Sequence, residues 1–365
     1  MKKLFIIIAA ALLAITTGAC AAKPAPDTTE NTAGVTGEAV GDKTYKKQDG
    51  VEVIYLAGGC FWGLEKLMET LPGVTDATSG YANGAGKDPT YATVSGGNSG
   101  YRETVRVEYS PDKVSLDMIL FTFFSAIDPT VENRQGNDVG SQYQSGIYYA
   151  DDASEATAQR IAAVERGRYS PFKVEIKPLT SFYDAEKYHQ DYLEKNPGGY
   201  CHITSKDFER AAKSIVDPAK YPRPSDDVIK AKLTEEQYNI TQKSGTEPAF
   251  DNEYWDKFEK GIYVDIVTGE PLFSSRDKFD PGTGWPSFTQ GIDDNALILI
   301  ADNSFGMKRT AVQSRAGNSH LGHVFYGKKE SSTGARFCID SAALRFVPVG
   351  DMEAQGYGDL KDYLG

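Results

Sequence analysis

The residue pattern of this chain changes in character near residue 225, and this change restricts the fold to two unlike units. Before residue 225, apolar and β-branched runs such as 51–57 alternate with segments of helical spacing such as 61–71. Beyond it, glycines, prolines and short strand-like runs such as 297–300 dominate. The alternation predicts an α/β or α+β domain first, and the short strand-like runs predict a mainly β domain second.

The length and composition agree with two globular domains joined by a linker. The chain has 365 residues, of which 40% are hydrophobic and 25% are charged. Pro222 and Pro224 end a charged segment of weak helical pattern, so we expect an inter-domain linker over residues 205–231. The first domain is expected at residues 49–204 and the second at residues 232–358, without an internal repeat.

The N-terminus has the pattern of an export signal. Two lysines precede an apolar run over residues 4–15, which is too short to span a bilayer. Residues 17–20, Thr-Gly-Ala-Cys, are similar to a lipobox, so residues 1–20 are expected to be a signal peptide of a lipoprotein with lipidation at Cys20. The alternative is ordinary secretory cleavage at a neighbouring alanine. Either route predicts an extracytoplasmic protein.

Two features of the composition limit the partners of the chain. Residues 21–48 are rich in Ala, Thr, Gly, Pro and charge, which predicts a flexible linker and membrane contact only through a lipid anchor. The domains would then face the periplasm or the cell surface. The formal net charge of -12 argues against nucleic acid as a partner, because phosphate binding needs a basic surface.

Cys60 is a candidate nucleophile because of its place between an expected strand and an expected helix. It follows Gly58-Gly59 and opens the helix, where the first-turn amides and the helix dipole favour a thiolate. Phe61 and Trp62 add aromatic surface, which suits a substrate with a small apolar group on its reactive centre. The alternative is a buried, inert thiol, but a Gly-Gly-Cys turn is a poor core position.

The remaining cysteines occur singly, in settings that differ from one another. Cys201 follows a glycine-rich loop, and Cys338 follows Arg336 on an expected strand. Structural disulfides come from denser cysteines, so we interpret these as individual reactive groups. His320 and His323 precede Cys338 and are suited to pass protons. A metal site is the alternative, but zinc needs a further ligand and the chain has no Cys-x-x-Cys pair.

Several short motifs occur in order within residues 49–204. They are Gly-Cys-Phe-Trp-Gly at 59–63, Asp-Pro-Thr-Tyr at 88–91, Gly-Tyr-Arg-Glu at 100–103, Gln-Gly-Asn-Asp and Ser-Gln-Tyr within 135–143, and two blocks at 189–193 and 196–202. Together they closely resemble methionine sulfoxide reductase A. The resemblance implies an α+β domain of the α/β sandwich type that reduces one epimer of methionine sulfoxide.

This resemblance implies a role for each polar residue of the first site. Cys60 as a thiolate would attack the sulfoxide sulfur, and Glu103, kept protonated by an apolar site, would protonate the departing oxygen. Tyr91 and Tyr143 would hydrogen-bond that oxygen. Asp138 would support their network.

The resemblance also implies how the substrate is held and how the cycle closes. Phe61 and Trp62 would hold the methyl group of the substrate. The oxygen is transferred to Cys60, which becomes a sulfenic acid. Cys201 matches the resolving cysteine of the family, which would condense with it to form a disulfide.

A second set of motifs lies within residues 232–358. They are Leu-Thr-Glu-Glu-Gln-Tyr at 233–238, Lys-Phe-Asp at 278–280, Gly-Thr-Gly-Trp-Pro-Ser-Phe at 282–288, and the blocks at 320–325 and 336–345. They closely resemble methionine sulfoxide reductase B, which implies a mainly β domain that acts on the opposite epimer.

The second resemblance again implies roles by residue. Cys338 would be the nucleophile, and His320 and His323 would hold and protonate the sulfoxide oxygen. Arg336 and Asp340 would tune the thiolate and its water network. Trp285 would pack on the substrate methyl group.

Two departures from the second family alter the expected mechanism. Zinc-binding members carry two Cys-x-x-Cys pairs, and the equivalent positions here are Asp265, Thr268, Ser314 and Gly317. We therefore expect no zinc and no other bound cofactor. Many members keep a resolving cysteine where this chain has Thr283, so Cys338 needs an external thiol or a cysteine of the first domain.

The combined prediction is an exported fusion enzyme that reduces both epimers of methionine sulfoxide in oxidised proteins or as the free amino acid. The resemblance implies a thioredoxin-like dithiol as the electron donor. One alternative is a thiol peroxidase, in which peroxide rather than sulfoxide oxidises Cys60. Another is a non-catalytic surface module that binds through its aromatic pockets.

Overall fold

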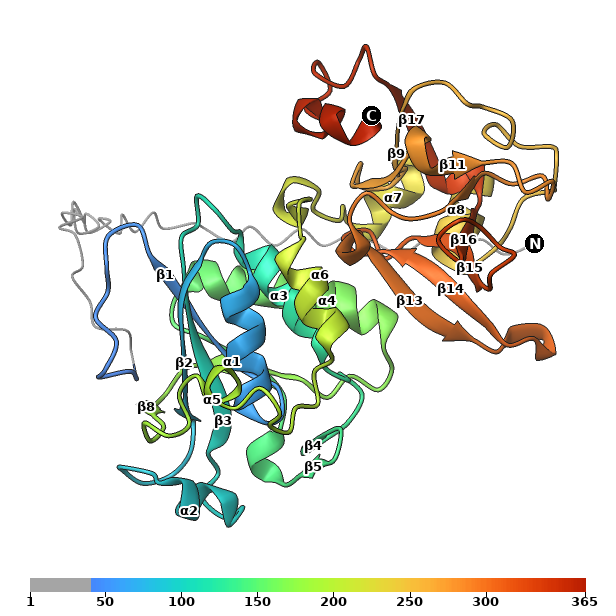
Figure 1. Cartoon of the computed structure of the whole chain (residues 1–365). Helices are drawn as coiled ribbons and strands as arrows, with labels where there is room; N and C mark the ends of the chain where they lie inside the picture. The colour runs from blue at the N-terminus through green and yellow to red at the C-terminus, as the bar shows by residue number, and fades with distance from the viewer. Residues whose placement is uncertain (1–40) are drawn as a thin grey trace, which may run out of the picture. The chain divides into compact units, whose positions relative to one another are not determined.

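The computed structural model describes residues 41–365 (Figure 1). The predicted signal peptide, the predicted lipidation at Cys20 and residues 21–40 of the predicted linker lie outside the described residues. The rest of that linker is not free: Asp42 is buried and accepts hydrogen bonds from the Tyr55 hydroxyl (2.9 Å) and from Arg106 (3.1 Å). The linker expectation is therefore wrong for this segment, because a buried arginine anchors it to the sheet.

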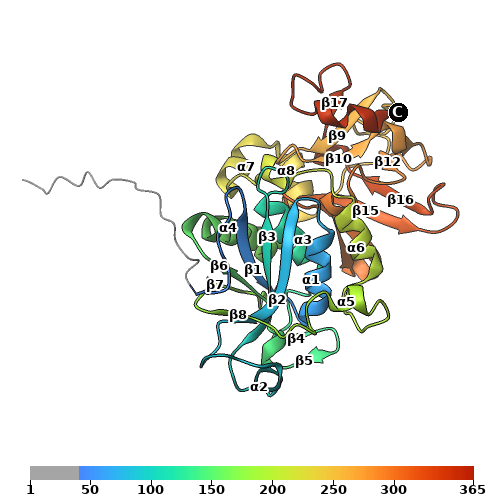
Figure 2. The ribbon, with the colours of Figure 1, turned by 60° about the vertical axis from the view of Figure 1, so that its left-hand side comes forward.

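The first domain is built on a six-stranded sheet with the order β7-β6-β1-β3-β2-β8. All neighbouring strands are antiparallel except β6 and β7. The central strands β1, β3 and β2 lie side by side (Figure 2). The strand bounds are β1 Glu52–Ala57, β2 Val74–Ala82, β3 Arg102–Tyr109, β6 Gly146–Tyr149, β7 Glu175–Pro178 and β8 Phe182–Asp184.

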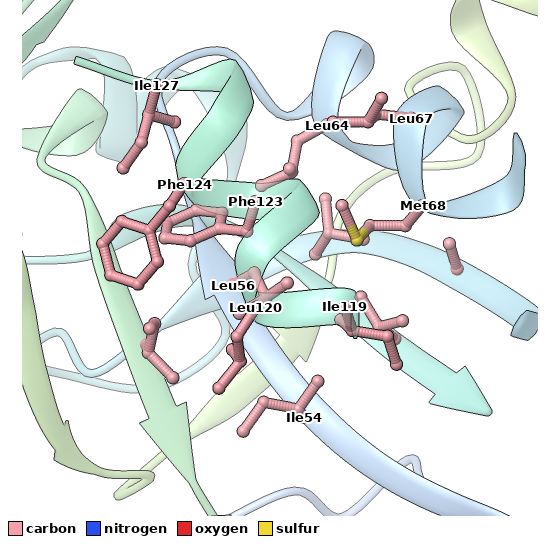
Figure 3. Packing of buried hydrophobic residues seen from close by; sticks show 14 of the residues in the cluster. Ile54, Leu56, Leu64, Leu67, Met68, Ile119, Leu120, Phe123, Phe124 and Ile127 are labelled. Carbon is pink, nitrogen blue, oxygen red and sulfur yellow. The ribbon is translucent and has the colours of Figure 1, made fainter. Parts of the chain in front are cut away.

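Strand side chains alternate between two faces of this sheet, and the helices cover one of them. Ile54 and Leu56 of β1 point to the face where α1 (Phe61–Thr70) and α3 (Leu116–Ala126) pack, and Figure 3 shows them among the apolar side chains of both helices. Each fully buried Leu, Ile or Phe stabilises this core by roughly 1.5–3 kcal/mol. Tyr55, on the opposite face, packs in a smaller cluster.

The helices of the first domain begin where the sequence predicts. The helical spacing of residues 61–71 is confirmed as α1, and α3 and α4 (Asp152–Arg168) follow in the same domain. The Asp151 carboxylate caps the first turn of α4 at a distance of 2.7 Å. Among residues 41–365, no helix is both long and apolar enough to cross a membrane.

The packing of the first domain continues beyond its expected end. α6 (Ser205–Ala212) lies in the stretch that was predicted to be an inter-domain linker, yet Ala211 is buried in the core that α1 and α3 form. A short 3₁₀ turn (Pro218–Lys220) and α7 (Asp226–Lys232) follow. A charged composition hid the apolar stripe of α6, which consists of few residues.

The second domain is mainly β, as predicted. A three-stranded sheet has the order β10-β9-β17 and a six-stranded sheet has the order β11-β12-β16-β15-β14-β13, with antiparallel pairing throughout. In the core, the rings of Phe273 and Phe288 are stacked with their centroids 4.4 Å apart. The strand bounds are β9 Gly261–Asp265, β10 Pro271–Ser274, β11 Lys278–Phe279, β12 Ser287–Phe288, β13 Leu297–Asp302, β14 Arg309–Ser314, β15 His320–Tyr326, β16 Ala335–Ile339 and β17 Leu344–Pro348.

Candidate active sites

Cys60 lies at the strand–helix junction that the sequence predicts. β1 ends at Ala57, Gly58 and Gly59 turn the chain, and Cys60 is the N-cap residue of α1. Gly59 has a φ of +83°, and a Cβ atom there would lie 2.6 Å from the Gln135 side chain. Only glycine fits this turn. The resulting position buries the Cys60 side chain, which is 7% exposed.

Burial dominates the protonation of Cys60. Loss of solvation raises the pKa of its thiol, the charge of Glu103 raises it further, and a hydrogen bond from the Trp62 backbone lowers it. The helix N-terminus alone does not produce a resting thiolate, in contrast to the sequence-based expectation.

Glu103 is a buried carboxyl group beside the first nucleophile. It lies on β3, is 2% exposed, and accepts a hydrogen bond from the Phe61 amide at 3.2 Å. Burial raises its pKa to about 8, and the Phe61 bond only partly offsets this shift. At neutral pH the carboxyl group of Glu103 is therefore mostly protonated.

The structure brings the remaining polar residues of the first site together. Tyr91 opens α2 (Tyr91–Ser95) and Tyr143 closes a 3₁₀ turn (Ser141–Tyr143). Burial and then the charges of Glu103 and Cys60 raise the pKa of Tyr91, whereas the neighbouring side chain of Tyr143 lowers it. Burial raises the pKa of Tyr143, and the charges of Glu103, Tyr91 and Cys60 raise it further. Asp138 contributes to the raised pKa values of both Cys60 and Glu103. These five residues therefore share one site.

Two residues that the sequence reasoning did not single out contact the aromatic side chains and Tyr91 of the first site. The indole Nε1 of Trp62 donates to Nδ1 of the buried His189 (3.1 Å), whose ring also lies 5.0 Å from that of Phe61. Glu186 accepts a hydrogen bond from the Tyr91 amide at 2.9 Å. His189 is one of only four histidines in the chain, and this scarcity was the available signal.

Cys201 lies in a loop and packs against α1, the helix whose N-cap is Cys60. Its sulfur is so close to Gly63 of α1 that a Cβ atom on this glycine would be 2.6 Å from it. Cys60 and Gly63 are three residues apart and so lie on the same face of the helix. The charge of Cys201 is also among the causes that raise the pKa of Cys60. The two free thiols are thus neighbours in the reduced protein.

Cys338 lies on β16, between strands that bring a hydroxyl and an imidazole to it. In the sheet register it is opposite Ser287 of β12 and His323 of β15. Burial raises the pKa of its thiol, the charge of Arg336 lowers it, and the nearby hydroxyls of Ser287 and Thr283 lower it as well. Thr283, at the position of a resolving cysteine in other members, is therefore adjacent to the sulfur.

The two histidines of the second site have different environments. Their rings are 5.5 Å apart, and His320 is 5% exposed whereas the side chain of His323 is 18% exposed. Burial lowers the pKa of His320 to about 4, with the charge of His323 as the next cause, so His320 is neutral at pH 7. His323 forms a 2.8 Å contact with Asp302, a residue that the sequence reasoning missed.

Asp340 acts on Trp285 of the second site through the backbone of Glu247. It is buried, accepts hydrogen bonds from the Thr246 hydroxyl (2.8 Å) and the Glu247 amide (3.2 Å), and burial raises its pKa to about 6. The carbonyl oxygen of Glu247 in turn accepts a hydrogen bond from the Trp285 indole (3.2 Å). Asp340 therefore fixes the segment that orients Trp285, a connection that the sequence did not reveal.

Arg336 is held at the edge of the second site by an acidic partner. Its Nε donates to Glu330 at 2.8 Å, and its guanidinium lies 4.6 Å from the centre of the Phe325 ring. Its charge still acts on Cys338, where it opposes the effect of burial on the thiol pKa. The geometry thus gives Arg336 an electrostatic influence on the nucleophile.

The four positions that carry cysteines in zinc-binding members form a hydrogen-bonded cluster. The fully buried Asp265 accepts hydrogen bonds from Ser314 (2.7 Å) and Thr268 (3.2 Å), and a side chain on Gly317 would collide with its carboxylate. Within residues 41–365, no group of three or more His, Cys, Asp or Glu is arranged to hold a metal ion. One carboxylate and a few hydroxyls do not fit the thiolate-rich zinc site of those members.

Two family models match the chain in succession. The model described as Peptide methionine sulfoxide reductase matches residues 52–219, and the model described as SelR domain matches residues 233–348. Fold and sites together define a thiol-dependent reductase with two catalytic domains. The chain belongs to the peptide methionine sulfoxide reductases. It carries the (S)-S-oxide reductase activity in its first domain and the (R)-S-oxide reductase activity in its SelR domain.

Solved structures of similar proteins each cover less than half of this chain. Mxr1 from Saccharomyces cerevisiae in reduced form is 35% identical, covers 45% of this chain and 97% of its own, and has a TM-score of 0.42. Methionine sulfoxide reductase A of Corynebacterium diphtheriae is 40% identical, covers 42% of this chain and 79% of its own, and has a TM-score of 0.39. A structure of Saccharomyces cerevisiae Mxr1 in complex with Trx2 is 26% identical, covers 41% of this chain and 91% of its own, and has a TM-score of 0.30.

Proposed function

We propose that the first domain reduces the S epimer by direct attack of Cys60 on the sulfoxide sulfur. The observation that carries this proposal is the neutral, buried carboxyl group of Glu103 next to a buried thiol. As the attack proceeds, the substrate oxygen gains negative charge and takes the proton of Glu103. The sulfur–oxygen bond of the substrate breaks, and the products are methionine and a sulfenic acid on Cys60.

The substrate is held at both ends of its sulfoxide group. Phe61 and Trp62 hold the methyl group, because contact with their aromatic rings removes its apolar surface from water. The hydroxyls of Tyr91 and Tyr143 hydrogen-bond the oxygen, and Asp138 supports them. The hydrogen bond from Trp62 to His189 supports this proposal, because it fixes the indole before substrate arrives.

Cys201 then resolves the intermediate of the first domain. Its thiol attacks the sulfenic acid on Cys60, which forms a disulfide and releases water. The position of Cys201 against Gly63 supports this step. A thioredoxin-like dithiol reduces the disulfide and returns both cysteines to thiols.

The second domain reduces the R epimer with Cys338 as the nucleophile. Trp285 packs on the methyl group, and His320 and His323 bind the oxygen and supply its proton. Arg336 and Asp340 tune the site through charge and through the backbone of Glu247. Because Thr283 has no thiol, the sulfenic acid on Cys338 is reduced by an external thiol or by a cysteine of the first domain.

The biological role is repair of oxidised methionine outside the cytoplasm, in proteins or as the free amino acid. The lysines, the apolar run and Cys20 at the N-terminus support export and a lipid anchor. The hydrogen-bonded Asp265 cluster supports a second domain that folds without zinc. Metabolic labelling with a lipid precursor tests the anchor: the native chain should be labelled and a Cys20→Ala chain should not.

Epimer-resolved turnover tests the assignment of two separate sites. Each purified variant is assayed with S and R methionine sulfoxide and a dithiol reductant. Cys60→Ser should lose S-epimer reduction and keep R-epimer reduction, and Cys338→Ser should do the reverse. Loss of both activities in either variant, or of neither, contradicts the assignment. Peroxide should not replace the sulfoxide as oxidant of Cys60 in a single turnover, which separates the enzyme from a thiol peroxidase.

A further inference from the structure

The β13–β14 hairpin carries a carboxylate to the second site. Asp302 is the last residue of β13 and is opposite Arg309 in the register of the two strands. One oxygen of Asp302, Oδ2, lies 2.8 Å from Nε2 of His323 and accepts a hydrogen bond from Arg309 at 2.6 Å. The other oxygen, Oδ1, accepts from the Ser304 amide at 2.9 Å. This carboxylate is therefore fixed from three directions.

We propose that Asp302 is a positioning residue for R-epimer reduction, which makes His323 the proton donor and His320 a neutral binding group. The proposal rests on the proposed function of the second domain and divides a role that was assigned to both histidines. Asp302 does not touch the substrate in this scheme. It acts through the imidazole ring of His323.

The first step of the argument concerns which nitrogen of His323 carries hydrogen. Hydrogen bonds from Ser304, and next from His323 and Arg309, hold the pKa of Asp302 below its usual value. The carboxylate is therefore ionised and can only accept hydrogen bonds. Nε2 of His323 must therefore be the donor in this pair. The other ring nitrogen, Nδ1, then carries the lone pair, and in this proposal it takes up and returns the proton.

The second step concerns where that proton comes from. His323 and Cys338 are directly opposite on neighbouring antiparallel strands, an arrangement that places Cβ atoms roughly 4.5–5.5 Å apart. Nδ1 takes the thiol proton of Cys338, which leaves a thiolate and an imidazolium. The thiolate attacks the substrate sulfur, the proton passes to the oxygen, and this oxygen ends on Cys338 as a sulfenic acid. Overall, one thiol and one sulfoxide give one sulfenic acid and one thioether.

The third step concerns why His320 does not do the same work. Its ring is buried, and burial lowers its pKa to about 4, while the charges of His323 and Arg309 act in the same direction. The carboxylate of Asp302 opposes these effects but does not overcome them. The groups that face His323 are Asp302 and Arg309 from the hairpin, His320 from its own strand and Cys338 from β16. Of these, only Asp302 carries a negative charge before the thiol ionises.

The test replaces Asp302 with asparagine, which keeps the shape and removes the charge. In Asp302→Asn, kcat for the R epimer should fall roughly tenfold or more, within the range that general acid–base catalysis contributes, while KM stays within about threefold. The alkaline limb of the R-epimer pH profile should move to lower pH, and Asp302→Glu should restore part of kcat. Asp277→Asn, an acid-to-amide change elsewhere in the same domain, should leave the R-epimer activity unchanged.

The same chain contains its own folding control. S-epimer turnover by the first domain and the unfolding midpoint of the second domain should both stay unchanged in Asp302→Asn. ¹⁵N spectra of histidine should place the proton of His323 on Nε2 in the native enzyme. The proposal is overturned if R-epimer kcat changes less than twofold, if it falls with an unmoved pH profile, or if His323 carries its proton on Nδ1. R-epimer turnover that survives Cys338→Ser would instead refute the proposed function.

Discussion

The sulfur of Cys201 and the backbone of Gly63 are in direct contact, so that a single added methyl group would lie 2.6 Å from the sulfur. Glycine is unfavourable inside a helix by about 0.5–1 kcal/mol relative to alanine. At this position it leaves the space in which the resolving thiol rests one helical turn from Cys60. This contact predicts that the second half of the S-epimer cycle can be impaired without loss of the first half.

Gly63→Ala should therefore separate the two halves of that cycle. The methyl group displaces Cys201, so a single equivalent of S-epimer sulfoxide should still be reduced, but the Cys60–Cys201 disulfide should form at least tenfold more slowly. Rapid quenching followed by mass spectrometry distinguishes the sulfenic acid from the disulfide. Gly198→Ala, which adds a methyl group to the same loop where nothing lies within 4 Å, should behave as the native enzyme. Equal disulfide rates in both variants would contradict the prediction.

The buried carboxyl of Glu103 predicts a pH dependence of S-epimer reduction. Since its pKa is raised to about 8, the proton that the reaction needs is lost above that pH, and kcat/KM should decline there. Glu103→Gln should lower kcat/KM by roughly 10²- to 10⁴-fold, the contribution typical of general acid catalysis. R-epimer turnover of the same variant, measured in parallel, should not change.

The same carboxyl should also affect stability, in a direction that its raised pKa determines. The folded state binds this proton more tightly than the unfolded state, so the unfolding free energy should decrease as pH rises from about 4.5 to about 8. Glu103→Gln removes this contribution. Urea unfolding of the variant should consequently depend less on pH across this interval than unfolding of the native chain, and an equal dependence would contradict the prediction.

Thr283 predicts a gain of function in the second domain. Its hydroxyl is buried and has no hydrogen-bond partner among the described residues, and it is near enough to Cys338 to lower the pKa of that thiol, so a thiol at this position would be within reach of a sulfenic acid. Thr283→Cys should form an intramolecular disulfide with Cys338 after one turnover on the R epimer. Non-reducing peptide mapping detects it, and Thr289→Cys, in the same domain, should not form one. Absence of the disulfide in Thr283→Cys would place the two side chains too far apart.

The buried Asp265 cluster predicts that the Asp265 carboxylate stabilises the fold of the second domain at the place where zinc-binding members bind their metal. Asp265→Ala leaves the buried hydroxyls of Ser314 and Ser319 without their acceptor, so the unfolding free energy should fall by about 3 kcal/mol or more. The surface control Asp351→Asn should change it by less than about 0.5 kcal/mol. Adding a chelator to the native chain should leave its unfolding midpoint unchanged, whereas a lowered midpoint would indicate a bound metal.

The sequence predicted the parts of the sites that depend on neighbours along the chain. Cys60 could be located because strand, double glycine and helix are contiguous, and the same holds for Cys338 with its flanking charges. β2 was missed because its Thr, Asp, Ser and Gly residues give no apolar run, although β3 and β8 pair with it on both sides. A strand in the middle of a sheet can be specified by its partners.

The residues that support the sites could not be predicted for the opposite reason. His189 reaches Trp62 across 127 positions, and Asp302 reaches His323 across a hairpin whose register is not visible in the composition. Asp42 was assigned to a flexible linker because its surroundings are polar, yet Arg106 fixes it from 64 positions away. Such contacts are properties of the folded chain, and a local pattern does not contain them.

The burial of Cys60 and Cys338 has a consequence for how each thiol reacts with oxidants. Peroxides and other small oxidants react with thiolates, and a thiol whose pKa is raised by burial offers little thiolate to them. Under the proposed function, each thiol becomes a nucleophile only when a sulfoxide occupies its site. In this proposed mechanism, both cysteines react little with small oxidants between turnovers. Binding of an oxidised methionine makes the cysteine that reduces it reactive.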